Sequence, residues 1–285
     1  MEFTIRAANI EDAGNISRFL NAQSNIYRHL DWRTPQDWLG FQPYLLLEDQ
    51  SNLSAIMASP PEPPGVSWVR LFTANPRFNI SKIWHVLLEK TTAILEHSSN
   101  SRLVALGLQK WFEDLLIQSQ FTTRQSIVVL EWDESLPPQR SLPSDLIIRP
   151  MTVMDLPAVQ HLDELAFNPI WQHSVDALVL ALAQTSISTV AEIHHQVVAY
   201  QMSTSYASSG HLARLAVDPQ VQRQSIGYGL VRHLLLEFKQ RGVWRVTVNT
   251  QNDNAVSLSL YKKLGFELTG EEFKVYEYEV SGQSQ

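Results

Sequence analysis

Residues 217–229 join an apolar run to an amphipathic run through a polar loop that contains glycines, and they constrain the fold more than any other part of the chain. Before the loop, the apolar positions of residues 212–217 are typical of a buried strand, which Pro219 ends because proline has no amide hydrogen for a β-ladder. After the loop, apolar residues recur at every fourth position of residues 226–238, as on one face of a helix. The sequence therefore predicts a strand, a loop and a helix in succession.

The polar loop has the features of an anion-binding site. Its backbone N–H groups, together with the unpaired amides of the first helical turn, can point at a single anion. An ordinary strand-to-helix turn is the alternative for an isolated Gly-x-Gly. A dinucleotide fingerprint would need a third glycine where Arg232 stands. The residues expected to bind phosphate are Gln222, Arg223, Gln224, Ser225, Ile226, Gly227, Tyr228 and Gly229.

A second segment, residues 252–266, has the signals of a short helix. Asn254 is a candidate N-cap, because an asparagine oxygen accepts amide hydrogens of the first helical turn. Gly265 is expected to follow the helix as its C′ residue, and Tyr261 is expected to lie off the buried stripe. The stripe expected to face the core consists of Val256, Leu260 and Leu264.

Together the two segments resemble the acyl-CoA-binding motifs of the GNAT superfamily of N-acetyltransferases. The loop is similar to the pattern Gln/Arg-x-x-Gly-x-Gly/Ala, with Gln222, Ser225 and Gly227 at the marked positions. Residues 254–266 are similar to Asn-x-x-Ala/Ser-x-x-Leu-Tyr-x-x-x-Gly-Phe. Ser225 replaces a glycine but keeps the backbone N–H, so phosphate binding is expected to survive unless that position requires a positive φ.

The resemblance implies acetyl-CoA as co-substrate and direct transfer of its acetyl group to a primary amine of a small molecule or peptide. In the family, amides of the strand before the loop bind the thioester oxygen and the pantetheine, a tyrosine protonates the departing thiolate, and the asparagine helps to hold the cofactor. On this chain the tyrosine is Tyr261. The other expected cofactor contacts are Leu215, Ala216, Val217, Asn254 and Ser257.

The glutamates that the family often uses as general base are replaced in this chain. The family often places a glutamate on the strand before the loop or on the strand before the asparagine, and this chain has His211 and Asn249 there. A neutral imidazole, with an ordinary pKa of about 6.5, can relay the ammonium proton through water. We therefore predict His211 as the base, with Glu192 as the alternative.

Composition excludes several functional classes. The chain has no cysteine, which excludes disulfides, thiolate metal ligands and a cysteine acyl-enzyme. A net charge of −7 without long basic runs disfavours nucleic acid as a partner. No apolar run approaches the roughly 20 residues of a membrane helix, and no signal sequence is evident, so we expect a cytoplasmic protein. Adjacent His194 and His195 would point to opposite sides, and we expect no metal site.

A faint internal repeat indicates two domains. Residues 5–12 match residues 148–155, and Asn75-Pro76 falls opposite Asp218-Pro219, both at an offset of 143. Prolines and small polar residues interrupt the periodicity between the halves. The predicted architecture is a pair of tandem GNAT-like acyl-CoA N-acyltransferase domains of mixed α/β fold. We expect them at residues 1–134 and 146–285, with a linker at 135–145.

The first of these domains is predicted to be degenerate. No glycine occurs between Pro76 and Gly107, so the same phosphate loop cannot form there. In the same register, Leu116 stands where the second half has Tyr261. The first half is therefore expected to keep the scaffold without the chemistry.

Two functions from different classes remain open. The C-terminal motifs resemble ribosomal-protein alanine N-acetyltransferases, which favours an N-acetyltransferase acting as a monomer or homodimer. The absence of the usual glutamate favours a non-catalytic acyl-CoA-binding sensor or scaffold. The intact Tyr261 supports the enzyme, and turnover of acetyl-CoA with an amine would separate the two.

Overall fold

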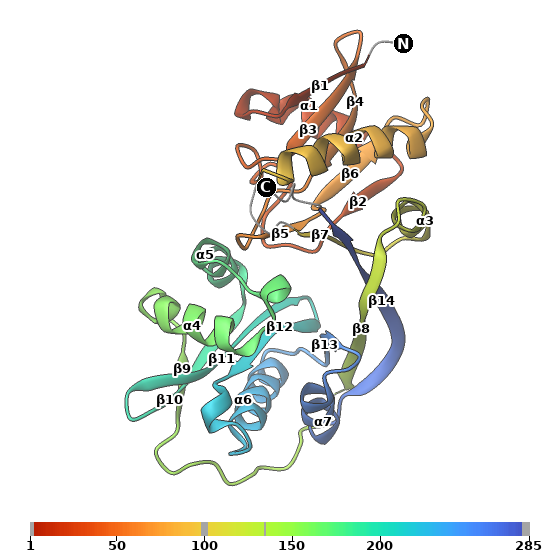
Figure 1. Ribbon diagram of the computed structural model, residues 1–285. Helices are drawn as coiled ribbons and strands as arrows, with labels where there is room; N and C mark the ends of the chain where they lie inside the picture. The colour runs from red at the N-terminus through yellow and green to blue at the C-terminus, as the bar shows by residue number, and fades with distance from the viewer. Residues whose placement is uncertain (1–2, 98–101, 134, 281–285) are drawn as a thin grey trace. The chain divides into compact units, whose positions relative to one another are not determined.

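The computed structural model describes residues 3–97, 102–133 and 135–280, and the chain forms two compact units (Figure 1). Unit 1 takes the residues up to Arg124 and those from Phe273 onward. Unit 2 is Gln125–Glu272. No helix in the described part of the chain is both long and apolar enough to cross a membrane.

Unit 1 is a mixed α/β unit. Its first sheet has the order β1 (Phe3–Ala7), β3 (Tyr44–Asp49), β4 (Asn52–Ala58), β6 (Leu71–Ala74) and β2 (Ile26–Arg28). A second run pairs β5 (Val66–Trp68), β7 (Arg102–Leu106) and the end of β14 (Glu267–Glu279). Its helices are α1 (Ala13–Asn21), α2 (Ile80–Leu95) and α3 (Lys110–Gln118). The larger core lies under α2 and α3 and is rich in aromatic rings, which include Phe72, Trp84 and Phe112.

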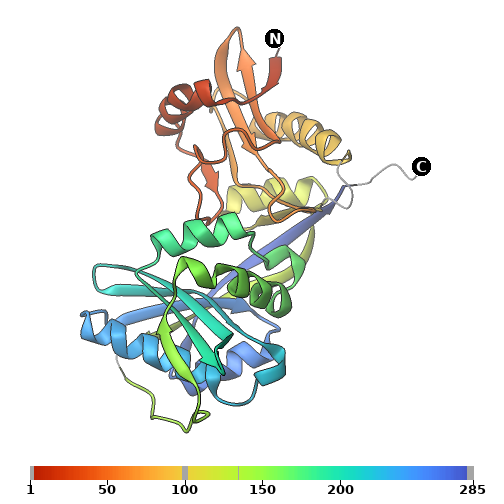
Figure 2. The same cartoon turned by 90° about the vertical axis from the view of Figure 1, so that its left-hand side faces the viewer.

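Unit 2 repeats this plan. Its strands run β8 (Thr122–Asp133), β13 (Arg245–Gln251), β12 (Ser209–Val217), β11 (Gln196–Tyr206), β10 (Ile187–Ile193) and β9 (Ile147–Pro150). Its helices are α4 (Leu156–Ala166), α5 (Val175–Gln184), α6 (Ile226–Gln240) and α7 (Ala255–Lys263). Helices α4 and α5 cover one face of the sheet and α6 the other (Figures 1 and 2). The apolar stripe expected for residues 226–238 is buried on β10, β11 and β12.

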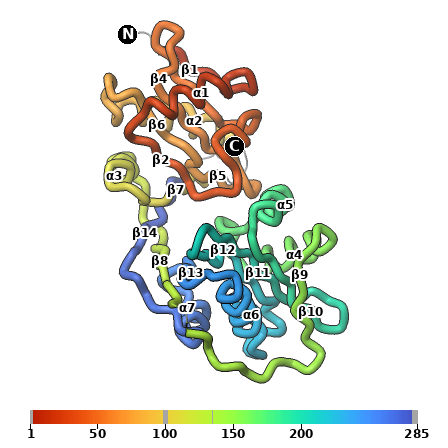
Figure 3. The backbone as a smooth tube through the Cα atoms, turned by 180° about the vertical axis from the view of Figure 1, so that it is seen from behind, coloured from red at the N-terminus to blue at the C-terminus, as the bar shows by residue number. Residues whose placement is uncertain are grey.

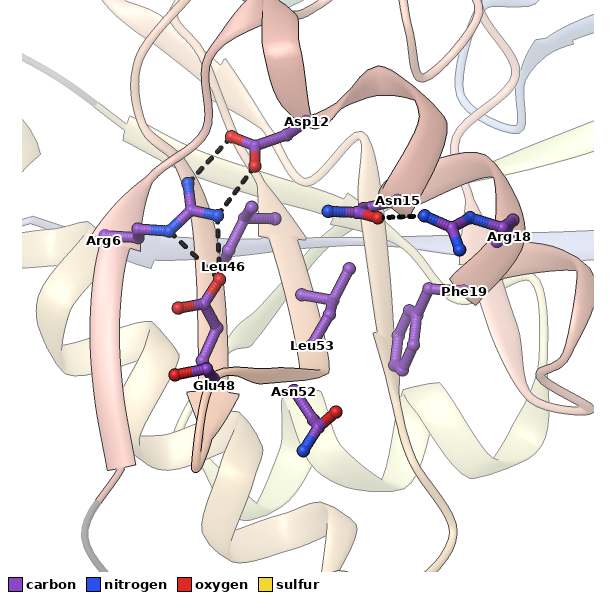
Figure 4. A pocket seen from close by; sticks show the side chains of 10 residues that line it. Arg6, Asp12, Asn15, Arg18, Phe19, Leu46, Glu48, Asn52 and Leu53 are labelled. Atoms are coloured by element: carbon purple, nitrogen blue, oxygen red, sulfur yellow. Dashed lines mark hydrogen bonds and ion pairs between the residues drawn. The ribbon is translucent and has the colours of Figure 1, made fainter.

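A network of one arginine and two carboxylates recurs in the two units. In unit 1, Arg6 Nη2 lies 2.7 Å from Asp12 Oδ1 and 2.8 Å from Glu48 Oε1, next to a pocket of about 310 Å³ (Figure 4). These two carboxylates and the carbonyl of Ala7 take all the nitrogens of this guanidinium. The corresponding network in unit 2 joins Arg149, Asp155 and Glu192, with both ion pairs at 2.7 Å. A network that recurs in this way is part of the scaffold, so the pocket beside Arg6 is not our candidate site.

The hairpin turns of the units also agree residue by residue. Gln50 and Ser51, between β3 and β4, have φ of 48° and 64°. His194 and His195, between β10 and β11, have the same two values. Because non-glycine residues rarely adopt positive φ, two successive residues that share this geometry support the internal repeat.

The units do not follow the boundaries expected from the sequence, 1–134 and 146–285. The proline-rich segment 135–145 joins β8 to β9 inside unit 2, and Glu134 lies outside the described residues. The segment rests on α6, where the Tyr228 hydroxyl donates to Pro138 O at 2.8 Å and Arg232 Nε donates to Pro137 O at 2.9 Å. Its prolines therefore mark a connection packed against a helix.

Candidate active site

The loop between β12 and α6 presents a row of unused backbone donors. Strand β12 ends at Val217, and a single 3-10 turn (Pro219–Val221) follows after Asp218. Within the described residues, no backbone N–H from Gln222 to Tyr228 donates a hydrogen bond; we call residues 222–228 the donor loop. The N–H of Gly229 donates to Ser225 O at 2.8 Å and is the first helical bond. Gly229, expected to bind phosphate, therefore has no free donor.

The donor loop has a left-handed backbone at two positions. Arg223 has φ of 66° and Ser225 has φ of 63°. Successive amides in such a conformation form a concave nest for an anion. Ser225 is the N-cap of α6, yet its side chain makes no capping bond. Positive φ is thus required at the position where the family motif has glycine, at a cost of about 1–2 kcal/mol for another residue.

Side chains of the donor loop point in different directions. Ile226 and Tyr228 are buried in the core of unit 2, so they can offer a ligand only their backbone amides. Gln222 is exposed, and its Nε2 donates to Val217 O at 3.3 Å. The site is therefore built from main-chain groups more than from side chains.

Strands β12 and β13 pair along only part of their length. The parallel ladder runs from Ser209–Arg245 to Leu212–Val248 and stops there, although β12 continues to Val217 and β13 to Gln251. Beyond Leu212, no strand of the described residues pairs with the side of β12 that faces β13, and we call this side the open edge. An unpaired strand edge offers hydrogen-bonding groups to an extended ligand.

The register of β12 on β11 decides which amides lie on the open edge. Asp218 N–H donates to Val198 O at 2.9 Å, so these two residues form a bonded pair. In an antiparallel ladder, hydrogen-bonded pairs alternate with pairs that make no hydrogen bond to each other. The N–H and C=O groups of Leu215 and Val217 therefore point away from β11, toward the open edge. The N–H and C=O groups of Ala216 point to β11, so Ala216, which was expected to contact the cofactor, has no free amide.

Helix α7 begins as expected and meets the donor loop. Asn254 is its N-cap, with Oδ1 accepting from Ser257 N–H at 3.0 Å. A Cβ on Gly227 would lie 3.3 Å from Val217 Cγ2 and 3.5 Å from Leu260 Cδ2. The end of β12, the start of α6 and the middle of α7 therefore converge at Gly227, and the chain path can be followed in Figure 3.

The expected buried stripe of α7 was wrong at its first position. Val256 is 70% exposed, whereas Tyr261 is only 5% exposed and packs on Phe266 with ring centres 5.6 Å apart. The hydroxyl of Tyr261 makes no hydrogen bond within the described residues, and burial raises its pKa. Tyr261 is thus a core residue whose polar end has no internal partner.

His211 lies on the face of the sheet opposite α6. Its chain neighbour Leu212 packs into the core under α6, so the His211 side chain projects toward the α4 and α5 side. Its Nδ1 is 2.9 Å from Thr247 Oγ1, and burial lowers its pKa below the ordinary value. Glu192, the alternative base, lies on β10, where it pairs with Arg149 of β9, and β11 separates it from β12. The structure therefore does not bring Glu192 to the open edge.

Sequence reasoning missed a buried charge cluster on this same face. Arg214 pairs with Asp163 of α4 and also lies 3.0 Å from the Tyr200 hydroxyl, which donates to Asp163. The signal in the sequence is an arginine within the apolar run of residues 212–217. No group of three or more histidine or carboxylate side chains among the described residues could hold a metal ion.

In the part of unit 1 that the structure describes, neither a donor loop nor an open edge occurs at the corresponding places. Asn79, the N-cap of α2, accepts the N–H of Lys82 at 3.0 Å, so its own side chain takes up a first-turn amide. Strand β2 pairs with the edge of β6 that corresponds to the open edge, with Tyr27 opposite Phe72. The Tyr27 hydroxyl also accepts the N–H of Leu106 in β7 at 3.1 Å.

Comparison with known proteins agrees with this geometry. Residues 156–266 match the model of the acetyltransferase (GNAT) family. Unit 2 carries a GNAT acetyltransferase domain. A relative is the [Ribosomal protein bS18]-alanine N-acetyltransferase of Escherichia coli strain K12, 28% identical over 119 residues that cover 42% of this chain and 79% of that protein. The prediction of a GNAT-family acyltransferase is confirmed.

The whole chain resembles two solved proteins in fold, one of which is a tandem protein. A tandem GNAT protein from the clavulanic acid biosynthesis pathway has a TM-score of 0.66 and 11% identity, covering 99% of this chain and 100% of that one. A GCN5-related N-acetyltransferase from Sphaerobacter thermophilus has a TM-score of 0.63 and 16% identity, covering 99% and 98%. At these identities the likeness concerns the fold, and it confirms the predicted tandem GNAT architecture.

Proposed function

We propose that unit 2 transfers the acetyl group of acetyl-CoA to a primary amine of a small molecule or peptide. The observation that carries this proposal is the donor loop, whose free amides lie next to the open edge of β12. The phosphates would be held by backbone N–H groups of residues 222–228 and the positive end of the α6 dipole. The amides of Leu215 and Val217 would bind the pantetheine and the thioester oxygen.

Two protons must leave the ammonium group in the reaction. Acetyl-CoA supplies an activated acetyl group, and a new C–N bond replaces the C–S bond. His211 removes a proton from the ammonium group, which leaves a nucleophilic amine. The proton released when the C–N bond forms ends on the departing sulfur. Because its pKa is raised, Tyr261 stays protonated at neutral pH and can donate a hydrogen bond to that sulfur.

The hydrogen bonds around His211 favour a base-competent tautomer. Thr247 Oγ1 has one hydrogen, and the carbonyl of Gly210 lies 3.5 Å away to accept it. Thr247 Oγ1 then accepts the hydrogen on His211 Nδ1. Nε2 keeps its lone pair, and the lowered pKa keeps the ring neutral near pH 7.

For the acceptor we favour the α-amino group of a peptide as the first test. The Escherichia coli relative is named for an alanine of a ribosomal protein. An α-amine, with a pKa of about 8, is also easier for an imidazole to deprotonate than a lysine amine at about 10.4. Small-molecule amines are the second group to test.

We also propose that unit 1 is a degenerate domain without an acyl-CoA site. The side-chain cap at Asn79 and the strand β2 on the edge of β6 support this. Calorimetry with acetyl-CoA should then give one site per chain.

Gly227→Pro tests the assignment to unit 2. This residue is second in α6, and its replacement removes a donor and brings a ring against Val217 and Leu260. We expect acetyl-CoA binding to be lost. The matched control is Ser81→Pro, at the second position of α2, which should leave binding unchanged. Two sites per chain, or loss of binding in the control, would contradict the assignment. Binding without thiol release for any amine would indicate the sensor instead.

A further inference from the structure

A β-bulge in β12 turns a charged side chain toward the face that carries His211. Met202 of β11 pairs with Arg214, but the next residue of β11, Ser203, pairs with Leu212, so Ala213 is the extra residue. A bulge reverses the alternation of side chains beyond it. Leu215 then packs under α6, and Arg214 projects to the opposite face.

On that face, Arg214 joins β12 to the connection between α4 and α5. Its guanidinium pairs with Asp163 of α4 and lies 3.9 Å from the ring centre of Phe167. Its Nη2 donates to the carbonyl of Trp171 at 2.6 Å. The side chain is only 8% exposed, so these contacts are shielded from water. We call residues 167–173 the acceptor segment.

Asp163 holds the far end of the acceptor segment. This carboxylate is fully buried, and its Oδ1 accepts the N–H of His173 at 2.8 Å. Its Oδ2 accepts from Arg214 and from the Tyr200 hydroxyl. The segment is thus fixed at Trp171 by the arginine and at His173 by the carboxylate that the arginine neutralises.

We propose that Arg214 is a positioning residue that sets the affinity for the acceptor amine through this segment. The inference rests on the proposed function. His211 faces the α4 and α5 side, so the amine that it deprotonates must approach on that side, where the acceptor segment lies. Arg214 directly precedes Leu215, whose amide lies on the open edge. The arginine therefore connects the thioester position to the wall of the amine site without touching either substrate.

Arg214→Lys tests this in the full-length protein. Lysine keeps a positive charge beside Asp163 but cannot also reach Trp171 and stack on Phe167. We expect hydrogen exchange of the amides of residues 171–173 to rise at least about tenfold, with exchange in the donor loop unchanged. The KM for an alanine-initiated hexapeptide should rise about tenfold, while the Kd of acetyl-CoA stays within about twofold.

Two further variants separate positioning from general stability. Arg149→Lys is the matched control, because Arg149 also pairs with a buried aspartate but does not contact the acceptor segment. Phe167→Leu removes the stacked ring and leaves the ion pair, so it should raise exchange at 171–173 to a smaller extent.

The result for Arg214→Lys distinguishes a positioning role from a structural one. Unchanged exchange at residues 171–173 overturns the proposal, even if no amine is turned over. Raised exchange with an equally weakened acetyl-CoA Kd, or with an unchanged peptide KM, shows a structural role and also overturns it. If the wild-type protein acetylates no amine, the proposed function fails, and the exchange result still decides whether Arg214 holds the segment.

Discussion

Replacing Ser225 by glycine should stabilise unit 2, which is unusual for a serine at a helix N-cap. The residue has φ of 63° and ψ of 11°, in the left-handed region. That conformation costs a non-glycine residue about 1–2 kcal/mol. Glycine removes this strain but gives the unfolded chain more freedom, worth about 0.5–1 kcal/mol. The expected net gain in unfolding free energy is about 0.5–1 kcal/mol.

The side chain of Ser225 adds nothing that glycine would lose. Its hydroxyl makes no capping bond, so Ser225→Ala should leave the unfolding free energy nearly unchanged. The matched control is Ser174→Ala in α5, where the hydroxyl accepts the N–H of Ala177 at 3.1 Å. Loss of that cap should cost about 1 kcal/mol.

Urea denaturation with and without acetyl-CoA measures these effects. Ser225→Gly should raise the midpoint with an unchanged m-value, and acetyl-CoA should bind at least as tightly as to the wild type, because every N–H of the donor loop remains. Destabilisation by Ser225→Gly would show that the position is not strained. An equal loss in Ser225→Ala and Ser174→Ala would show that the hydroxyl caps α6 after all.

Tyr261→Phe should lower kcat by about 10²-fold and leave the acetyl-CoA Kd unchanged, because only the proton donor is lost. An unchanged single-turnover rate would make the hydroxyl structural. His211 must be neutral to act as base, and burial lowers its pKa, so kcat/KM should fall with acidity through a midpoint below about 6.5. His211→Gln should abolish this fall of kcat/KM at acid pH. An unchanged pH profile in the variant would exclude the histidine as the general base. The pKa of Asp155 is lowered from 3.8 to about 2, chiefly by its bond with Arg149. The ion pair therefore stabilises the folded state fully above about pH 3.8, and this stabilisation is lost as the pH falls toward 2. Asp155→Asn should flatten this part of the acid-unfolding curve.

Local signals in the sequence were sufficient for the framework of the site. Pro219 follows the end of β12 and begins the 3-10 turn, Asn254 caps α7, and Gly265 follows α7 with φ of 88°. Each of these residues acts on the backbone within a few positions of itself. Such effects do not depend on the rest of the fold, so they can be predicted from the sequence.

The orientation of α7 could not be predicted in the same way. The helix has nine residues, and in so short a segment Val256 and Tyr261 compete for the buried side. The packing of Tyr261 near Phe266 decides the matter, and that is a tertiary contact. The sequence pattern favoured the aliphatic valine over the amphipathic tyrosine, and the structure has the opposite arrangement.

Long-range pairing explains the other differences. The boundary expected after residue 134 ignored β8, whose residues Ile127–Asp133 pair with β13 and so belong to unit 2. The role of Arg214 depends on a bulge, which is a mismatch between two strands. Neither feature is encoded near the residues that it affects, so neither follows from periodicity or spacing.

The two units differ at the connection between the strand and the helix that follows it. Helix α6 begins seven residues after Pro219, and α2 begins four residues after Pro76. The shorter connection has no residue with positive φ among those described, and its Asn79 side chain satisfies the amide of Lys82. The sheet and the helix of unit 1 are kept, because their apolar faces still build a core. Loop length and a free strand edge therefore distinguish the two units, although both share one fold.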